Sequence, residues 1–242
     1  MKAFAAQTRM ELSLGLRQGE QLLVSIGIPL LLLVFFSLVD VLPKPPGVDD
    51  PVTFLAPGVL ALAIMSTAMV SLGIGTGFER QYKVLKRLGS TPLGRPRLIG
   101  AKIAMVLAME LVQVIVLVPT ALALGWNPDG SIALVIPAYL LGTAAFAGIG
   151  LLMAGTLKGT VTLAAANGLY LVLLLLGGMI IPLTKLPAAI RFVAELLPAA
   201  PLARVMQAAF DSSVSARPHD WIVLVAWAVA APLAAARLFR WE

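Results

Sequence analysis

Hydrophobic residues fill long stretches of this 242-residue chain, and short polar segments separate them. A helix needs about 20 apolar residues to cross roughly 30 Å of hydrocarbon. Backbone polar groups must be paired within such a span, so each stretch is expected to be helical. The pattern therefore predicts an all-α membrane protein with six transmembrane helices, over residues 22–42, 54–77, 103–124, 132–154, 161–182 and 220–238.

The first 21 residues are too polar to span a membrane, but their apolar positions recur at a helical spacing. Residues of this apolar series are Phe4, Thr8, Leu12 and Leu16. The other side of the predicted helix carries polar residues, namely Gln7, Arg9, Glu11, Arg17 and Gln18. We expect a helix that lies in the membrane interface.

The longest segment between spans, residues 183–219, contains two short helical patterns. One covers 186–197 and is stopped by Pro198, and the other covers 202–210. Apolar helices of about ten residues are typical of re-entrant or interfacial elements. We expect a re-entrant outer hairpin before the last span, within a single transmembrane domain over residues 1–242.

Composition and charge support this interpretation and give an orientation. With 60% apolar residues, 12% charged residues and a mean hydropathy of +0.95, the chain lies outside the soluble globular range. If the N-terminus lies inside, few of the 18 basic residues lie outside, namely Lys44, Lys185, Arg191, Arg204 and Arg217. Since Lys and Arg are retained on the cytoplasmic side, both termini are expected there. The pI near 10.0 then reflects topology, and no nucleic-acid partner is expected.

Several kinds of site are excluded by residue content. The chain has no cysteine and one histidine, His219, so no metal site is expected. The segment Gly155–Thr160 lacks the Gly-x4-Gly-Lys-Ser/Thr spacing that cradles ATP phosphates. The chain is therefore expected to bind no nucleotide or other cofactor and to have no enzymatic activity of its own.

The basic segment 79–102 lies between the second and third spans and holds seven basic residues. Residues 80–88 have the period of an amphipathic helix, which favours a docking surface for a soluble partner. In this hypothesis Leu85 and Leu88 insert into the partner, and the polar contacts come from Glu79, Arg80, Lys86 and Arg87. The alternative is that these bases only enforce topology.

Three polar residues inside the spans are candidates for a substrate pathway. Glu110 is the acid well inside a span, and Gln113 follows it by one turn. An intramembrane carboxylate costs about 2.5–3.5 kcal/mol on insertion scales, so it should face protein or water. The alternative for Glu110 is a structural contact with the first span, the interfacial helix or a basic residue. Asn167 in the fifth span is expected to make an interhelical hydrogen bond. The alternative for Asn167 is a contact with substrate in the pathway.

Small residues predict close packing and a break in the bundle. Two small-x-x-x-small pairs in the fourth span let helices approach closely, and they comprise Ala144, Gly148, Gly150 and Ala154. Residues that end the fifth span, and are candidates for a gate or hinge, are Gly177, Gly178 and Pro182.

The order of these features resembles a known family. Its pattern Glu-Arg…Leu-Lys-Arg-Leu…Thr-Pro-Leu is met by Glu79-Arg80, 85–88 and 91–93. Further matching elements are Arg9 and Arg17, Pro29, the segment 54–58, Gly177-Gly178, Pro182, Leu186-Pro187 and Leu197-Pro198. Over nearly its full length the chain is similar to permease subunits of type-2 ATP-binding-cassette exporters, particularly small actinobacterial multidrug permeases.

That resemblance implies a partner and a location. Two separate ATPase subunits, which bind ATP and Mg, would pair with two permeases in the bacterial cytoplasmic membrane. The second permease would be identical or homologous. The basic segment would then be a cytoplasmic coupling helix set into a groove of the ATPase, and the substrates would be hydrophobic or amphipathic small molecules moved outward.

One position departs from the family pattern. Lys83 stands about where the family usually has glycine. Lysine favours a helix over glycine by roughly 1 kcal/mol, so the loop helix is expected to start earlier than is typical.

The same sequence features are compatible with other functions. The chain could be a polysaccharide, lipid-linked sugar or haem permease of the same family, or a membrane scaffold that recruits a soluble protein. An ion-driven secondary transporter is disfavoured, because the chain shows no internal repeat and few intramembrane charges.

Overall fold

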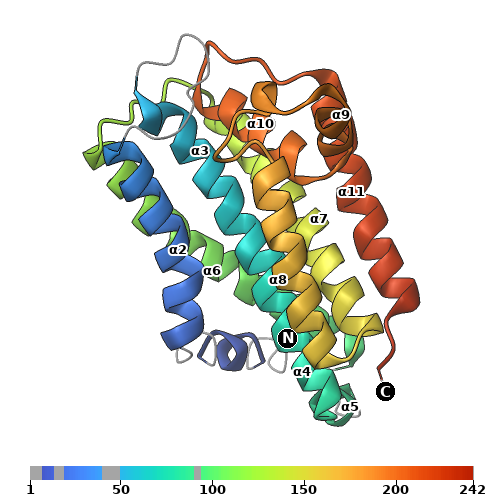
Figure 1. Cartoon of the computed structure of the whole chain (residues 1–242). Coiled ribbons are helices and arrows are strands. Elements are labelled where there is room, and N and C mark those ends of the chain that lie inside the picture. Colours follow the sequence, from blue (N-terminus) through green and yellow to red (C-terminus); the bar gives the residue numbers. More distant parts are fainter. Residues whose placement is uncertain (1–6, 14–18, 40–49, 90–93, 242) are drawn as a thin grey trace.

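The computed structural model describes residues 7–13, 19–39, 50–89 and 94–241. Within these residues every regular element is helical, which confirms the all-α membrane class. Six long elements run roughly side by side in Figure 1, namely α2 (Gly19–Leu38), the continuous helix Pro51–Gln81, α6 (Arg95–Ala123), α7 (Ile132–Thr156), α8 (Gly159–Leu176) and α11 (Pro218–Leu238).

These helices correspond to the six predicted spans. Five of them are long and apolar enough to cross a membrane, and α2 contributes a shorter apolar stretch, Ser25–Leu38. The second span and α6 are longer than predicted, at 31 and 29 residues. α8 is shorter, since it ends at Leu176 instead of the predicted 182. Gly178 has φ +67°, in the left-handed region that glycine adopts without cost, so the chain leaves the helix there.

The second span is the central helix of the bundle and changes its hydrogen bonding halfway along. It begins as α3 (Pro51–Ile64), widens to the π-helix η1 (Met65–Ser71) and continues as α4 (Leu72–Gln81). Ile64, Met65 and Met69 are fully buried. The π-segment therefore lies where the span is surrounded by other helices, chiefly α7 and α8.

Glycines let the helices approach one another closely, as the small-residue pattern predicts. A Cβ on Gly148 would lie 2.4 Å from the backbone nitrogen of Pro232 in α11, and one on Gly150 would lie 2.6 Å from the Met69 carbonyl oxygen. α7 thereby packs against α11 on one side and against η1 on the other.

The predicted broken hairpin is present between α8 and α11. It comprises η2 (Leu183–Lys185), α9 (Ala188–Leu196) and α10 (Ala199–Phe210). Arg204 of α10 pairs with Glu195 at 2.9 Å and with the fully buried Asp220 of α11 at 2.8 Å. The indole nitrogen of Trp227 donates to the Leu196 carbonyl at 2.9 Å. These contacts hold the hairpin against the last span.

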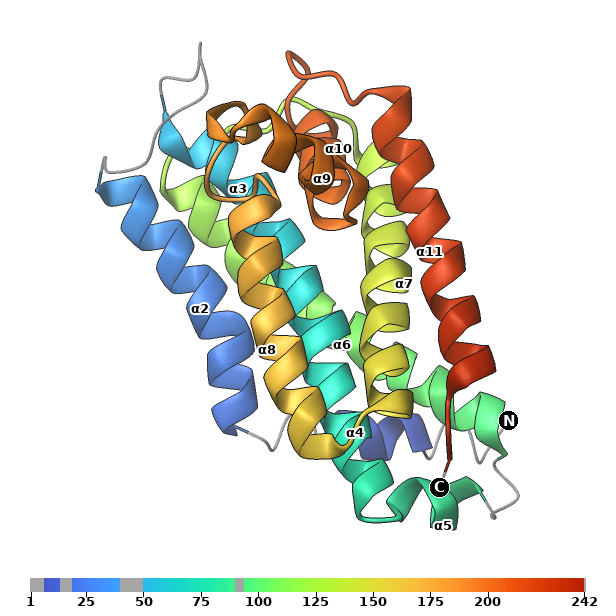
Figure 2. The ribbon, with the colours of Figure 1, turned by 45° about the vertical axis from the view of Figure 1, so that its right-hand side comes forward.

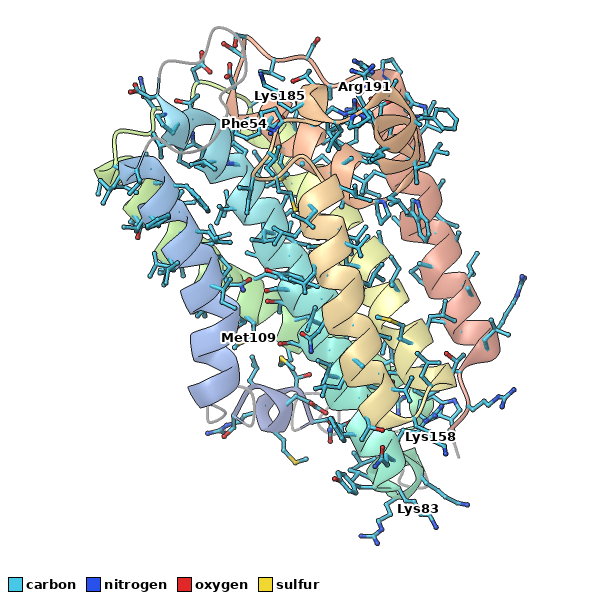
Figure 3. The ribbon with its side chains drawn as sticks, viewed as in Figure 1. Phe54, Lys83, Met109, Lys158, Lys185 and Arg191 are labelled. Carbon is cyan, nitrogen blue, oxygen red and sulfur yellow. The ribbon has the colours of Figure 1, made fainter. Side chains whose placement is uncertain are left out.

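The bundle has two distinct ends. At the α5 end, the short helix α5 (Val84–Gly89) projects beyond the spans, and the N-terminal helix at residues 7–13 runs across the bundle (Figures 1 and 2). The hairpin forms the opposite, α9 end. Figure 3 shows Lys83 and Lys158 at the α5 end and Lys185 and Arg191 at the α9 end.

Candidate functional site at the α5 end

The connection from the second span to α5 is a tight turn at Lys83. Lys83 has φ +60° and is, among the described residues, the non-glycine residue with positive φ. A left-handed residue cannot continue a right-handed helix, so α4 ends at Gln81 and α5 starts at Val84. The expected earlier start is therefore wrong. Glu79 and Arg80 belong to the spanning helix and not to the loop helix.

The turn gives a measurable prediction for stability. A left-handed conformation costs an L-residue roughly 1–2 kcal/mol, and glycine avoids this cost. The freer unfolded chain of glycine offsets about 0.5–1 kcal/mol of that gain. We expect Lys83→Gly to raise the unfolding temperature in detergent by about 2 °C. Lys83→Ala keeps the unfavourable conformation and should show no gain. An equal gain in both variants would assign the effect to the lysine charge.

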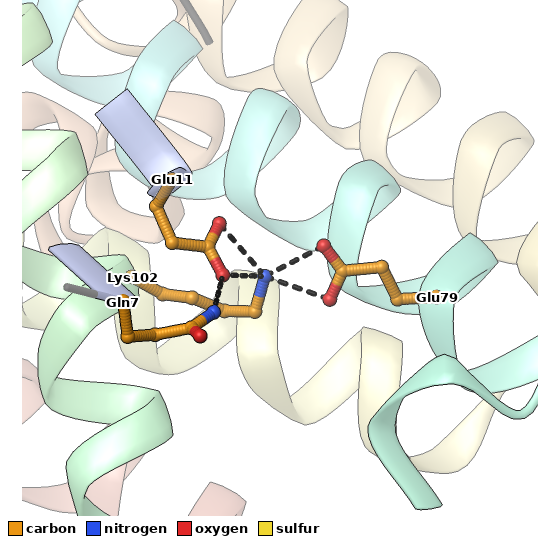
Figure 4. A network of polar contacts seen from close by, with 4 residues as sticks. All are labelled: Gln7, Glu11, Glu79 and Lys102. Carbon is orange, nitrogen blue, oxygen red and sulfur yellow. Dashed lines mark hydrogen bonds and ion pairs between the residues drawn. The ribbon is translucent and has the colours of Figure 1, made fainter. Parts of the chain in front are cut away.

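Lys102 forms the centre of a buried polar network at this end (Figure 4). Its ammonium nitrogen lies 2.7 Å from both carboxylate oxygens of Glu79 and 3.3 Å from both of Glu11. Gln7 Nε2 donates to Glu11 Oε1 at 2.9 Å. The network joins three elements that are distant in sequence: the N-terminal helix, α4 and α6.

The network corrects two expectations. Lys102 is 3% exposed, so it does not belong to the exposed surface of the basic segment 79–102, with which the sequence groups it. Gln7 and Glu11 are buried, whereas the helical period places them on the polar face of the N-terminal helix. Glu11 is buried on this face with Lys102 as its counter-charge, and a buried charge requires such a partner.

Arg80 holds the other side of the α4 terminus. Its guanidinium donates to the carbonyl oxygens of Gly155 and of Leu157, the latter at 2.7 Å, and approaches that of Arg240 at 3.4 Å. The last carbonyls of a helix lack partners and carry partial negative charge, so a cation there is favourable. Arg80 thus ties α4 to the end of α7 and to the segment after α11.

The two leucines of the loop helix face the protein. Leu85 is fully buried and packs with Leu98, with Leu88, Phe239 and Trp241 around them. Leu85 is therefore covered by this chain itself and does not present its side chain to a partner in this conformation. The exposed residues of the turn and of α5 are Tyr82, Lys83, Val84, Lys86 and Arg87.

The candidate docking set consequently divides into two groups. Glu79, Arg80 and Leu85 hold the base of α5 against the bundle. Lys86 and Arg87 lie on its exposed side, and Leu88 is partly buried. Sequence reasoning missed the network of Glu11 and Lys102. The available signal was Glu79 and Lys102, an acid and a base at the facing edges of two consecutive apolar segments.

The candidate pathway residues of α6 make contacts between helices. Glu110 is 1% exposed and accepts a hydrogen bond from Thr143 of α7 at 2.8 Å. Gln113 is equally buried and donates to the Ser25 carbonyl of α2 at 2.9 Å. The partner of Glu110 is thus α7, and it is Gln113 that reaches the first span. Glu110 Oε1 and Gln113 Oε1 have no hydrogen-bond partner within the described residues.

Asn167 lies apart from this pair, on the exposed side of α8. Its Nδ2 donates to Leu163 of the same helix at 3.0 Å, so the expected interhelical bond is not formed within the described residues of this chain. The hinge candidates Gly177, Gly178 and Pro182 are all buried. Met179, which follows Gly178, packs its backbone against Gly58. A Cβ on residue 58 would lie too close to the Met179 carbonyl oxygen.

This arrangement defines a class of protein: a multi-pass helical membrane protein with a braced helix projecting from one end. Comparison with family models gives a match over residues 2–210 to "ABC-2 type transporter". The chain therefore belongs to the ABC-2 type transporter family and is its membrane-spanning permease part. Comparison with curated proteins gives no match.

Proposed function

We propose that this permease works in an ATP-driven exporter and takes its energy from a separate ATPase that docks on α5. The observation that carries the proposal is the placement of α5. It projects beyond the spans, and its base is tied through Glu79 and Arg80 to α6, α7 and the N-terminal helix. A push on α5 would therefore reach several helices at once.

The docking surface is the exposed side of the turn and of α5, with Tyr82, Lys83, Lys86 and Arg87. Tyr82 is 66% exposed and stacks on Phe78, which gives an aromatic contact beside the bases. Aromatic residues and arginine are enriched at protein interfaces. An ATPase groove with an acidic rim would complement this surface, and two ATPase subunits carrying ATP and Mg would serve a pair of permeases.

Charge reversal of the exposed cations tests the docking surface while Glu79, Arg80 and Leu85 are left unchanged. In Lys86→Glu/Arg87→Glu we expect the amount of co-purified ATPase to fall at least tenfold, because like charges now oppose each other across the interface. Lys158→Glu/Arg237→Glu reverses two exposed cations at the same end and should leave co-purification unchanged. Arg80 is left unchanged in this variant because its guanidinium donates to carbonyl oxygens at the end of α7. Full ATPase recovery with the first variant would contradict the proposal.

A second permease is proposed to cover the exposed side of α8. Asn167 places an amide on that surface within a membrane-spanning helix. A polar side chain facing lipid is costly, so contact with protein or a polar pathway is favoured. The partner would be identical or homologous, and the Gly177–Gly178 break beside this surface is the proposed hinge of the exit.

The proposed substrates are hydrophobic or amphipathic small molecules, drug-like or lipid-like, moved out of the bacterial cytoplasm or the inner leaflet. Glu110 and Gln113 supply polar groups in an apolar wall and are proposed to line the route. Substrate-stimulated ATP hydrolysis in proteoliposomes separates this function from that of a scaffold, which would recruit a soluble partner without stimulating hydrolysis.

A further inference from the structure

The hairpin at the α9 end exposes an apolar surface beside two exposed cations. α9 exposes Ile190, Val193 and Leu196 at helical spacing, together with Phe192, which is 66% exposed. Its one buried residue is Ala194, which packs with Leu183 and Ala200. The remaining apolar arc of α9 therefore faces away from the protein.

The charges around this arc differ in their partners. Arg204 and Arg217 both pair with Glu195, at 2.9 Å and 3.7 Å. Lys185 in η2 and Arg191 in α9 are exposed, and neither has an ion-pair partner among the described residues. Two cations at the edge of an apolar helix are thus left to bind an anion from outside the chain.

The position of α9 relative to the last span indicates its depth. The Leu196 carbonyl accepts from Trp227, which lies nine residues after Pro218 at the start of α11. At 1.5 Å per residue this is about 13 Å along the span. The end of α9 therefore lies beside the first half of α11, whose exposed apolar residues Ile222 and Val225 extend the apolar surface of α9. Lys185 and Arg191 lie at the α9 end of the bundle (Figure 3), where long basic side chains can reach headgroups while their stems remain in apolar surroundings.

We propose that α9 and η2 bind an anionic phospholipid, with the acyl chain against Ile190, Phe192 and Val193 and the headgroup phosphate on Lys185 and Arg191. An amphipathic helix at the interface with cations beside its apolar face has the chemistry that anionic lipid surfaces attract. The proposed site follows the Gly177–Gly178 break in the chain, with its first cation at Lys185. Lipid binding there requires neither the transport substrate nor the ATPase.

The absence of cysteine allows a clean measurement on the full-length protein. A bimane fluorophore on Ala189→Cys, an exposed position of α9, reports nearby brominated lipids by quenching. In mixed vesicles we expect brominated phosphatidylglycerol to quench at about one-tenth of the mole fraction that brominated phosphatidylcholine needs, because each near-surface cation adds several-fold to anionic-lipid binding. Equal quenching by the two lipids would overturn the proposal.

Variants assign the preference to the two cations. Lys185→Gln/Arg191→Gln should abolish it, while Lys185→Arg/Arg191→Lys should keep it. Lys158→Gln/Arg237→Gln removes two exposed cations at the α5 end and should also keep it. A preference that survives the first variant would rule out this site. If neither lipid quenches the fluorophore, then protein, such as a second permease, covers α9 and the lipid proposal is wrong.

Soluble anions separate a lipid site from a phosphate site. Millimolar glycerol phosphate carries the same headgroup chemistry without acyl chains and should not reduce the preference. If it does, the ligand is a soluble phosphate and the lipid proposal is wrong. ATPase co-purification is measured on the same samples, so failure of the lipid site and failure of the transport proposal give different results.

Discussion

Lys102→Met is expected to destabilise the folded permease by about 3–5 kcal/mol, the usual effect of leaving buried charge without its partner. Methionine has a similar length, so the variant removes the ammonium with little change in volume. Glu11, which is 6% exposed, and Glu79 would then face each other with no counter-charge among the described residues. The unfolding temperature in detergent should fall by roughly 10 °C, and abundance in the membrane should fall with it.

Two further variants make this result specific. Lys158→Met removes an exposed lysine at the same end and should leave the unfolding temperature nearly unchanged. Adding Glu11→Gln and Glu79→Gln to Lys102→Met removes the uncompensated charge and should recover most of the loss. If Lys102→Met is no worse than Lys158→Met, the network does not stabilise the fold.

Gly148→Val has the second large expected effect. The new Cβ would lie 2.4 Å from the Pro232 nitrogen and 2.7 Å from the Ala231 carbonyl carbon, both rigid backbone atoms. Helices α7 and α11 form the most extensive helix pair in the bundle, so they must separate along much of their contact. Overpacking of this kind costs about 1–3 kcal/mol, and a backbone clash places this variant at the upper end.

Gly75→Val is the matched control for that experiment. Gly75 is also a helical glycine, but a Cβ there has no atom within 4 Å. The two variants change helix propensity equally, so their difference in unfolding temperature measures the clash alone. Equal unfolding temperatures would mean that α7 and α11 do not approach as closely as Gly148 allows.

The helical type and approximate position of the long elements could be predicted from hydrophobicity, because membrane thickness sets a minimum length for each span. Five of the six predicted spans meet that length, and α2 has a shorter apolar stretch. The broken hairpin was also predictable from Pro198 and from short apolar periods. The π-helix η1 was not, since Ser66, Thr67 and Ser71 within it do not by themselves indicate a change in backbone hydrogen bonding.

The candidate site was predicted only in part. Amphipathic periodicity correctly identifies Leu85 as lying on an apolar face, but it cannot tell whether a partner or this chain covers that face. Here the cover comes from Leu98 and from Phe239 and Trp241, which are distant in sequence. Lys102 shows the same limit, because its charge indicates a membrane boundary and only tertiary structure shows that it points inward.

The π-segment also changes how experiments along the second span should be interpreted. Each π-turn holds more residues than an α-turn, so α3 and α4 are out of phase with one another. Cysteine cross-linking from residues 51–81 to the neighbouring helices should show two separate periodic series of contact positions, with a discontinuity at Met65–Ser71. Fitting one continuous wave to such data would assign the residues of α4 to the wrong neighbours.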